Sequence, residues 1–301
     1  MGAQLRLVRR RIGTVQSIAK ITRAQELIAS SRIVRAQQQM RAAEPYSREL
    51  TRAVEAVISR STNITHPFTK EPANPTRAAV LILTSDQGFA GAYNANVLRE
   101  AARLRQTLRE RGLEPVLYVA GRKGIGWHRF RELQLAGSWS GFSAAPRYQH
   151  AKAIADVLLE AFEDEDGGVD EIHLVATEFL SMLTQRPLVR RLLPLEIEET
   201  EEEHPSGPLP QYEFEPSPEV VLDALLPQYV ASRIYYALLE AAAAELASRR
   251  RAMKAATDNA GDLLETLTRE ANNARQAEIT QEISEIVGGA NALAAAGATS
   301  E

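Results

Sequence analysis

Cysteine is absent from the 301-residue sequence. Its absence excludes disulfide bonds, thiolate metal ligands and cysteine nucleophiles. Long apolar runs are absent as well, because no stretch reaches the roughly 18 residues of a membrane-spanning helix. The basic residues near the start are not followed by the apolar core of a secretion signal. We therefore expect a cytoplasmic protein without direct insertion into a membrane.

The usual motifs of nucleotide binding and catalysis are also missing. The segment Gly88–Gly91 has two glycines and falls short of G-x-G-x-x-G, and no G-x-x-x-x-G-K-[ST] sequence occurs. Ser85 and Asp86 lack the G-x-S-x-G setting of a hydrolase nucleophile. The five histidines show no pairing at a spacing of three or four residues. The sequence thus predicts no catalytic residue, cofactor or metal, and Asp86, Gly88 and Gly91 are interpreted as shaping a turn.

Between Gln228 and Val287, Gly261 is the single glycine and proline is absent. About 60 helical residues would extend roughly 90 Å at about 1.5 Å per residue. A coiled-coil seam with seven-residue spacing is predicted at Leu246, Met253, Ala260, Leu267 and Ala274, with Ala256, Leu263 or Leu264, and Ala271 between them.

The first 60 residues carry a second helical pattern. Pro45 is expected to kink this helix or end it near Glu44. Its apolar stripe comprises Leu5, Val8, Ile12, Val15, Ile18, Ile21, Ala24, Ile28 and Val34. We expect Leu5–Val34 to pack antiparallel against Leu246–Ala274 within one chain, because both stripes need a partner.

In the middle of the chain the spacing of the apolar residues changes from a helical pattern to one of alternating strands and helices. Strands are predicted at Ala79–Thr84, Pro115–Ala120, Glu171–Thr177 and, as an edge strand, Leu188–Ile197; helices are predicted at Ala92–Arg111, Gly126–Leu133 and Arg147–Phe162. Alternating strands and helices indicate a mostly parallel, Rossmann-like sheet. The predicted fold class is α/β, with this domain inserted between the two helices of a long antiparallel coiled coil.

The pattern divides the chain into five segments. These are an N-terminal coiled-coil helix (1–60), a linker (61–76), the α/β domain (77–198), an acidic and proline-rich loop (199–218) and a C-terminal coiled-coil helix (219–301). Residues 1–43 carry nine Lys and Arg against the single Glu26. That basic arm lies on a patterned helix without aromatic residues before Tyr46, so we predict no nucleic-acid partner.

Three longer motifs occur along the chain: Ser17–Ala29 (SIAKITRAQELIA), Ser85–Asn94 (SDQGFAGAYN) and Ile279–Ala290 (ITQEISEIVGGA). In this order they resemble the gamma subunit of F-type ATP synthase. The absence of cysteine favours the bacterial type, since plastid members carry a cysteine-bearing insertion. The resemblance implies a non-catalytic rotor shaft inside a hexamer of alpha and beta subunits, which couples the proton-driven c-subunit ring to the beta catalytic sites.

The same resemblance implies further partners and a place in the cell. The α/β domain is expected to contact the epsilon subunit and the c-subunit ring. The whole complex would hold this chain peripherally at the cytoplasmic face of the plasma membrane. Two alternatives to this interpretation are a nucleotide-dependent α/β enzyme that dimerises through its helices and a nucleic-acid-binding or scaffolding coiled coil.

The end of the final helix carries the predicted contacts. The seam shifts phase between Ala274 and Ile279. A new apolar stripe follows at Ile283, Ile286, Ala290 and Leu293, beyond the expected overlap with the first helix. In the family such a stripe sits in an apolar collar of the hexamer. The resemblance also implies that Arg275, Gln276 and Thr280 contact a loop of the beta subunit.

Overall fold

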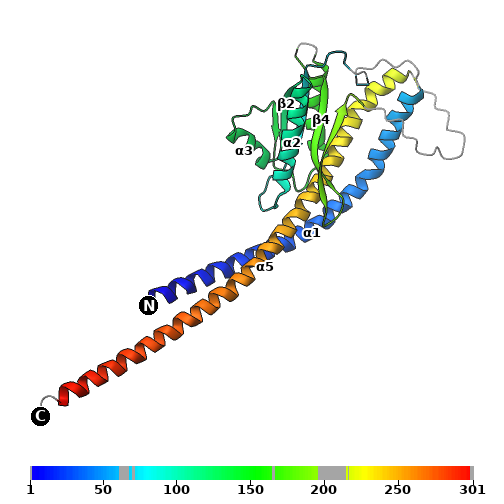
Figure 1. Cartoon of the computed structure of the whole chain (residues 1–301). Coiled ribbons are helices and arrows are strands. Elements are labelled where there is room, and N and C mark those ends of the chain that lie inside the picture. The colour runs from blue at the N-terminus through cyan, green and yellow to red at the C-terminus, as the bar shows by residue number, and fades with distance from the viewer. Residues whose placement is uncertain are drawn as a thin grey trace. The chain divides into compact units, whose positions relative to one another are not determined.

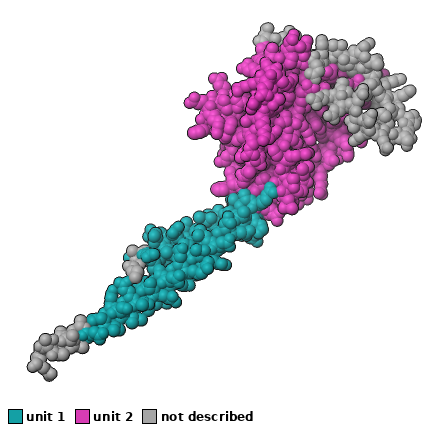
Figure 2. Space-filling view, in the orientation of Figure 1, with its two compact units in different colours: residues 1–28, 251–301 teal, residues 29–250 magenta. Residues whose placement is uncertain are grey.

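The computed structural model describes residues 2–60, 68–69, 72–164, 167–195, 215 and 217–298. For residues 2–3, 59–60 and 292–298 it describes the backbone alone. The chain forms two compact units, one of residues 1–28 and 251–301 and one of residues 29–250 (Figure 2). We call them the two-helix unit and the α/β unit. Helices α1 (Gly2–Arg60) and α5 (Pro218–Ala298) each contribute to both units (Figure 1).

In the two-helix unit, α1 and α5 pack antiparallel. The hydroxyl oxygens of Thr22 and Thr257 lie 2.7 Å apart, whereas Val8 lines a groove with Ala274. Earlier residues of α1 thus face later residues of α5. Of the predicted seam, Leu5, Val8, Met253, Ala260 and Leu267 are buried, and Ile12, Val15 and Ala274 are half-buried.

Beyond Val15 the predicted stripe of α1 is wrong. Ile18, Ile21, Ala24, Ile28 and Val34 are exposed, and the buried or half-buried positions are Ala19, Thr22, Glu26, Ala29 and Ile33. Three-residue steps turn a helix by about 300°, so a stripe built from successive steps of three drifts away from the seam. A strict alternation of three and four from Leu5 instead reaches Thr22 and Glu26. Glu26 has its own partner, since Arg23 Nη1 lies 2.8 Å from Glu26 Oε2.

The α/β unit contains a five-stranded sheet in the order β3-β2-β1-β4-β5. The strands are β1 (Arg77–Leu83), β2 (Glu114–Ala120), β3 (Gly137–Trp139), β4 (Glu171–Phe179) and β5 (Gln185–Leu193). All neighbours pair in parallel except β5, which runs antiparallel to β4. The predicted fold class is confirmed. The prediction missed β3, whose three residues include Gly137 and Ser138, both poor strand formers.

Helices cover both faces of the sheet. They are α2 (Tyr93–Glu110), α3 (Arg122–Phe130) and α4 (Tyr148–Glu163). Along β1, Val80 and Ile82 pack with Val97 of α2, while Leu81 packs on the other face with α4 and α5 residues such as Leu158. Burial on both faces explains why β1 is a continuous apolar run.

Proline does not end either long helix. Pro45 lies inside α1 and Pro227 inside α5. Of the two outcomes expected at Pro45, a kink or an end near Glu44, the end does not occur, and α1 continues to Arg60. A proline in a helix interior costs about 3 kcal/mol, and here tertiary packing offsets it: Val54 and Val57, beyond Pro45, are buried in one apolar cluster with Leu226 of α5.

The predicted linker and acidic loop fall largely outside the described residues. Of the linker (61–76), residues 68, 69 and 72–76 are described, and Phe68 is buried against Phe162 at a ring distance of 5.4 Å. Of the loop (199–218), residues 215, 217 and 218 are described. None of the helices in the described part of the chain is apolar over a length that could cross a membrane.

The pairing of the two helices can be tested at two leucines of α5. Leu267 is 3% exposed in the seam, whereas Leu263 is 45% exposed. We expect Leu267→Asp to lower the free energy of unfolding by about 3 kcal/mol or more, since an unpaired carboxylate is then buried among apolar groups. Leu263→Asp, the matched control, should change it by less than about 1 kcal/mol. Urea unfolding of the full chain measures both; equal effects would contradict the seam.

Candidate functional site

The first candidate site is the turn between β1 and α2, residues Ser85 to Tyr93. Phe89 and Gly91 adopt positive φ angles of 61° and 55°, so glycine suits position 91. A Cβ at Gly88 would meet only the Lys123 side chain, at 3.5 Å, so space alone does not require glycine there. The Asn94 side chain closes the turn, because its Oδ1 accepts from the Ser85 N–H at 2.9 Å.

Asp86 is the centre of hydrogen bonding in this turn. Its carboxylate accepts from the backbone N–H groups of Arg122 (3.1 Å), Gly141 (2.8 Å) and Ser143 (2.9 Å). Burial by itself would raise the pKa of Asp86, but these three bonds and the Arg122 guanidinium outweigh it and hold the pKa below its ordinary value. A carboxylate engaged in this way joins three segments at one edge of the sheet and is a poor general base.

Two residues of α5 complete this region, and sequence reasoning missed both. Arg249 donates from Nη2 to the Gln87 carbonyl (3.1 Å) and from Nε to the Gly88 carbonyl (3.2 Å). Its Nη2 also lies 2.7 Å from Glu245 Oε1. Arg249 and Glu245 are both buried. The one available signal was their i, i+4 spacing, which is typical of a helical ion pair.

A second cluster of charged groups lies where β4 begins. The Glu171 carboxylate accepts from Arg111 at 2.5 Å and is 2.7 Å from His173 Nε2. Burial lowers the pKa of His173, so the imidazole is neutral at pH 7. Burial would raise the pKa of Glu171, but Arg111 and His173 lower it below its ordinary value. The cluster ties the end of α2 to the sheet, and its carboxylate is already satisfied.

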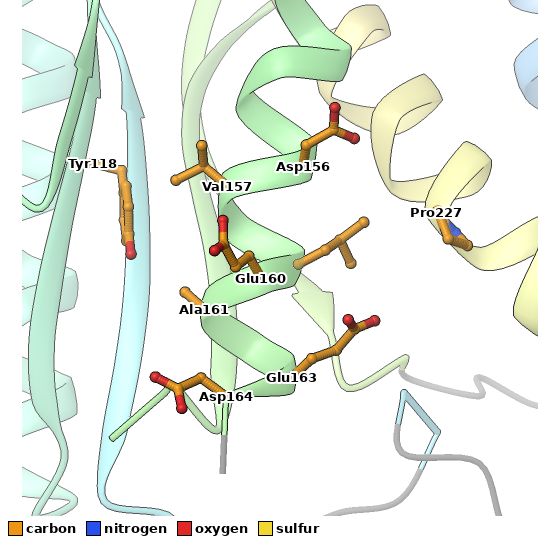
Figure 3. A pocket seen from close by; sticks show the side chains of 9 residues that line it. Tyr118, Asp156, Val157, Glu160, Ala161, Glu163, Asp164 and Pro227 are labelled. Atoms are coloured by element: carbon orange, nitrogen blue, oxygen red, sulfur yellow. The ribbon is translucent and has the colours of Figure 1, made fainter. Parts of the chain in front are cut away.

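An acidic depression of about 770 Å³ lies beside α4 (Figure 3). The carboxylates of Asp156 and Glu163 lie on the side of Pro227, and those of Glu160 and Asp164 on the side of Tyr118. Lys152 Nζ is 2.8 Å from Asp156. The four carboxylates come from α4 and from Asp164, which directly follows it. They carry one sign of charge, without the base and nucleophile pairing of a catalytic site. Among the described residues no group of acidic and histidine side chains is arranged to hold a metal ion.

The second candidate site is the end of α5 in the two-helix unit. Helix α1 begins at Gly2, and Gln4 already faces Asn273 and Ala277 across a groove. From Ile279 to Asn291 every α5 residue is exposed. Ile283 is 56% and Ile286 is 71% exposed, and Ala290 is exposed too. The side chain of the predicted fourth member, Leu293, lies outside the described residues.

The predicted polar contacts lie on the same part of α5. Arg275, Gln276 and Thr280 are all exposed. The Thr280 hydroxyl donates to the Gln276 carbonyl at 2.9 Å, which leaves its oxygen free to accept a bond from a partner. The structure thus brings Arg275, Gln276 and Thr280 together with the exposed isoleucines in the two-helix unit. Asp86, Gly88 and Gly91 belong to the α/β unit.

Comparisons with known proteins agree with one another. A family model described as ATP synthase matches residues 4–293. The ATP synthase gamma chain of Acidothermus cellulolyticus is 63% identical over 299 residues, covering 99% of each chain. The gamma chain of Thermobifida fusca is 61% identical over 306 residues, covering all of both.

Solved structures show the same fold. A chain from the OSCP/F1/c-ring part of the Euglena gracilis mitochondrial ATP synthase gives a TM-score of 0.70 at 14% identity, covering 97% of this chain and 95% of that one. A chain from the central stalk and c-ring of the Tetrahymena thermophila enzyme gives 0.57 at 22% identity, covering 78% of this chain and 99% of that one.

The role of Asp86 can be tested by removing its charge. We expect Asp86→Asn to lower the free energy of unfolding by about 1.5–3 kcal/mol at pH 7, since an amide cannot accept all three backbone bonds. Because the folded pKa is lowered, the contribution is complete above the unfolded pKa of about 3.9 and is lost as pH falls through the folded pKa. The difference between parent and variant should therefore shrink in acid.

Urea unfolding from pH 7 to pH 3 measures this difference. Asp156→Asn is the matched control, because Asp156 is exposed and paired with Lys152 on the same helix. It should cost less than about 1 kcal/mol at any pH. An Asp86→Asn variant as stable as the control, or a loss that does not vary with pH, would contradict the assigned role.

Proposed function

The chain belongs to the family of ATP synthase gamma chains, and on this premise we propose how its residues serve as the rotor shaft. A gamma chain is a non-catalytic subunit of the central stalk, and the catalytic sites lie on beta. Its partners are the alpha and beta subunits, the epsilon subunit and the c-subunit ring. Rotation of the ring, driven by protons, would turn this chain and change the beta sites in sequence.

The observation that carries the proposal is the uncovered end of α5. Ile279, Ile283, Ile286 and Val287 are exposed together on a helix whose partner begins only at Gly2. Each buried apolar side chain of this size gains about 1.5–3 kcal/mol, so four exposed side chains on one stretch mark a surface for a partner. We assign that partner as the apolar collar of the alpha and beta hexamer.

Arg275, Gln276 and Thr280 are assigned to the contact with a beta-subunit loop. All three are exposed and polar. A contact that must form and break in every turn suits such side chains, because a hydrogen bond nets only about 0.5–1.5 kcal/mol in water, or about 1.5–3 with a charged group. Stronger burial would hold the shaft at one angle.

The paired part of the two-helix unit suits the transmission of torque. Its seam alternates large and small residues, with Leu267 and Met253 on α5 and alanine at position 260 between them. Two helices that share a buried seam resist twisting better than one, since each turn of one helix is held by side chains of the other. The chain is held in the ATP synthase complex, and we place it at the cytoplasmic face of the plasma membrane.

The alternative of a nucleotide-dependent enzyme has no support. The turn that such an enzyme would use for phosphate presents the Gln87 and Gly88 carbonyls to Arg249, whereas phosphate sites present N–H groups. The full-length match to gamma chains also leaves no part of the chain for a separate catalytic domain.

The proposed contact with the beta subunit predicts variants that assemble normally but turn over ATP more slowly. In a complex reconstituted with alpha and beta subunits, Arg275→Ala and Gln276→Ala should each lower ATP turnover by about tenfold, which corresponds to roughly 1.4 kcal/mol. The amount of complex recovered by size-exclusion chromatography should stay near that of the parent. Arg269→Ala, at an exposed position of α5 before the assigned contact, is the matched control. Parental turnover in both test variants would refute the contact.

The apolar end of α5 predicts that its removal weakens assembly with the hexamer and leaves the fold of the α/β unit unchanged. Deletion of residues 290–301 should weaken the association of the chain with the hexamer and leave the α/β unit folded, because that unit ends at Arg250. Circular dichroism melting and a titration of the hexamer measure the two properties. Ile283→Asp and Ile286→Asp should act in the same way, since a carboxylate in an apolar collar is costly. Unchanged affinity in all three variants would rule out the collar.

A further inference from the structure

The place where doubly wound sheets bind ligands is occupied by α5. In such sheets the crevice lies beyond the carboxyl ends of the strands, where the strand order reverses. Here β1 lies between β2 and β4, and the turn after β1 marks this position. Ala244 of α5 packs there against Ala90 of the turn and Tyr93 of α2. A side of the chain's own helix therefore fills the crevice.

A buried ion pair holds α5 to this edge of the sheet. The side chains of Glu245 and Arg249 are 1% and 5% exposed, and Arg249 bonds two consecutive carbonyls, those of Gln87 and Gly88. The planar guanidinium directs its N–H groups in fixed directions, so these bonds set an angle as well as a distance. A small rotation of α5 about its own axis would break them.

The pair continues into a longer polar network. The Ser143 hydroxyl bonds the Glu245 carboxylate and accepts from the Asp86 N–H at 2.8 Å. Asp86 in turn accepts from the Arg122 N–H, at the start of α3. The network thus runs from α5 through the segment after β3 and the turn after β1 to α3, all within the α/β unit.

The alanines next to this pair do little to set the angle. Residues 241–244 of α5 are four alanines, all buried. Apolar contact has no preferred direction. The short alanine side chains do not interlock with their neighbours, so they offer little resistance to rotation of the helix. Hydrogen bonds weaken steeply when their angle changes. The directional bonds of this part of α5 come from Arg249 and Glu245, and from Ser248, whose hydroxyl donates to Gln185 Oε1 at 3.2 Å. Of these three residues, Arg249 alone bonds the turn after β1.

We propose that Arg249 and Glu245 are positioning residues that lock α5 against rotation about its own axis within the α/β unit, so that torque on the domain is passed to the helix. The inference rests on the proposed rotor function. It predicts that loss of the lock softens the shaft in torsion without changing the chemistry at the beta sites.

Single-molecule rotation of the catalytic complex tests the lock. The hexamer is fixed to a surface, and a bead is attached through Ala102→Cys on α2, the single cysteine of a chain that otherwise has none. The angular variance of the bead in the ATP-waiting pause reports torsional stiffness. Arg249→Lys keeps the positive charge beside Glu245 but loses the paired guanidinium N–H groups that donate to the two carbonyls. We expect it to raise the variance by about twofold, because a single ammonium cannot donate in fixed directions to both carbonyls.

A second variant separates positioning from stability. Glu245→Gln combined with Arg249→Met removes both charges at similar volume, a change that is often neutral for stability when a buried pair is replaced as a whole. We expect the same rise in variance, with a melting temperature and an unloaded ATP turnover near those of the parent. Arg250→Lys, the adjacent arginine of α5, is the matched control and should leave the variance unchanged.

The outcomes are distinct. Parental variance in both variants overturns the lock, and so does failure of both variants to assemble, because the pair would then serve folding alone. A parent chain that forms no rotating complex with alpha and beta subunits would instead refute the proposed rotor function.

Discussion

The structure depends on one constraint: a long helix in water gains most of its stability from packing of its apolar stripe. Helix α1 has 59 residues and α5 has 81, and each covers the stripe of the other in the two-helix unit, from Leu5 to Thr22 on α1 and from Thr257 to Ala274 on α5. Antiparallel pairing within one chain requires the residues between the helices to bring the chain back. The inserted α/β fold does so, with its strands and three shorter helices in sequence between α1 and α5.

The α/β unit shows how a ligand-binding type of fold can serve a mechanical role. Its sheet has the order and the crevice of doubly wound domains. In this chain the crevice contains α5, whose Ala244 and Arg249 contact the turn after β1. The carboxylate of Asp86 accepts three backbone bonds instead of acting on a substrate. The polar groups that would bind a ligand elsewhere here bind the chain's own helix.

The two-helix unit divides α5 into a covered and an uncovered part, and the two parts serve different purposes. Up to Glu278 the α5 side chains alternate between seam and solvent, which stiffens the helix pair. Beyond it, Ile283 and Ile286 are exposed. An apolar surface of this kind lowers solubility unless a partner covers it, so its exposure on α5 indicates assembly into a larger complex.

The sequence by itself determined most element types, with β3 as the exception, because periodicity depends on local geometry: continuous apolar runs for β1 and β4, and seven-residue recurrence for α5. It also indicated the uncovered end, since the isoleucines beyond Ala274 had no partner in the pattern. Tertiary structure alone decided which polar residues enter the seam. Thr22 lies there opposite the Thr257 hydroxyl of α5, and a hydrophobic pattern cannot detect such a pair. Glu26 is buried beside Arg23 of its own helix.

The same limit applies to Arg249. In the sequence it opens a run of three arginines that resembles a solvent-exposed face, yet it is buried, since Gln87 and Gly88, far away along the chain, supply its acceptors. The continuation of α1 through Pro45 was decided in the same way, by the burial of Val54 and Val57 against α5. Local sequence determines which backbone conformations are low in free energy. Long-range contacts then determine which of these conformations is adopted, because the free energy of burying a residue depends on partners that the local sequence does not contain.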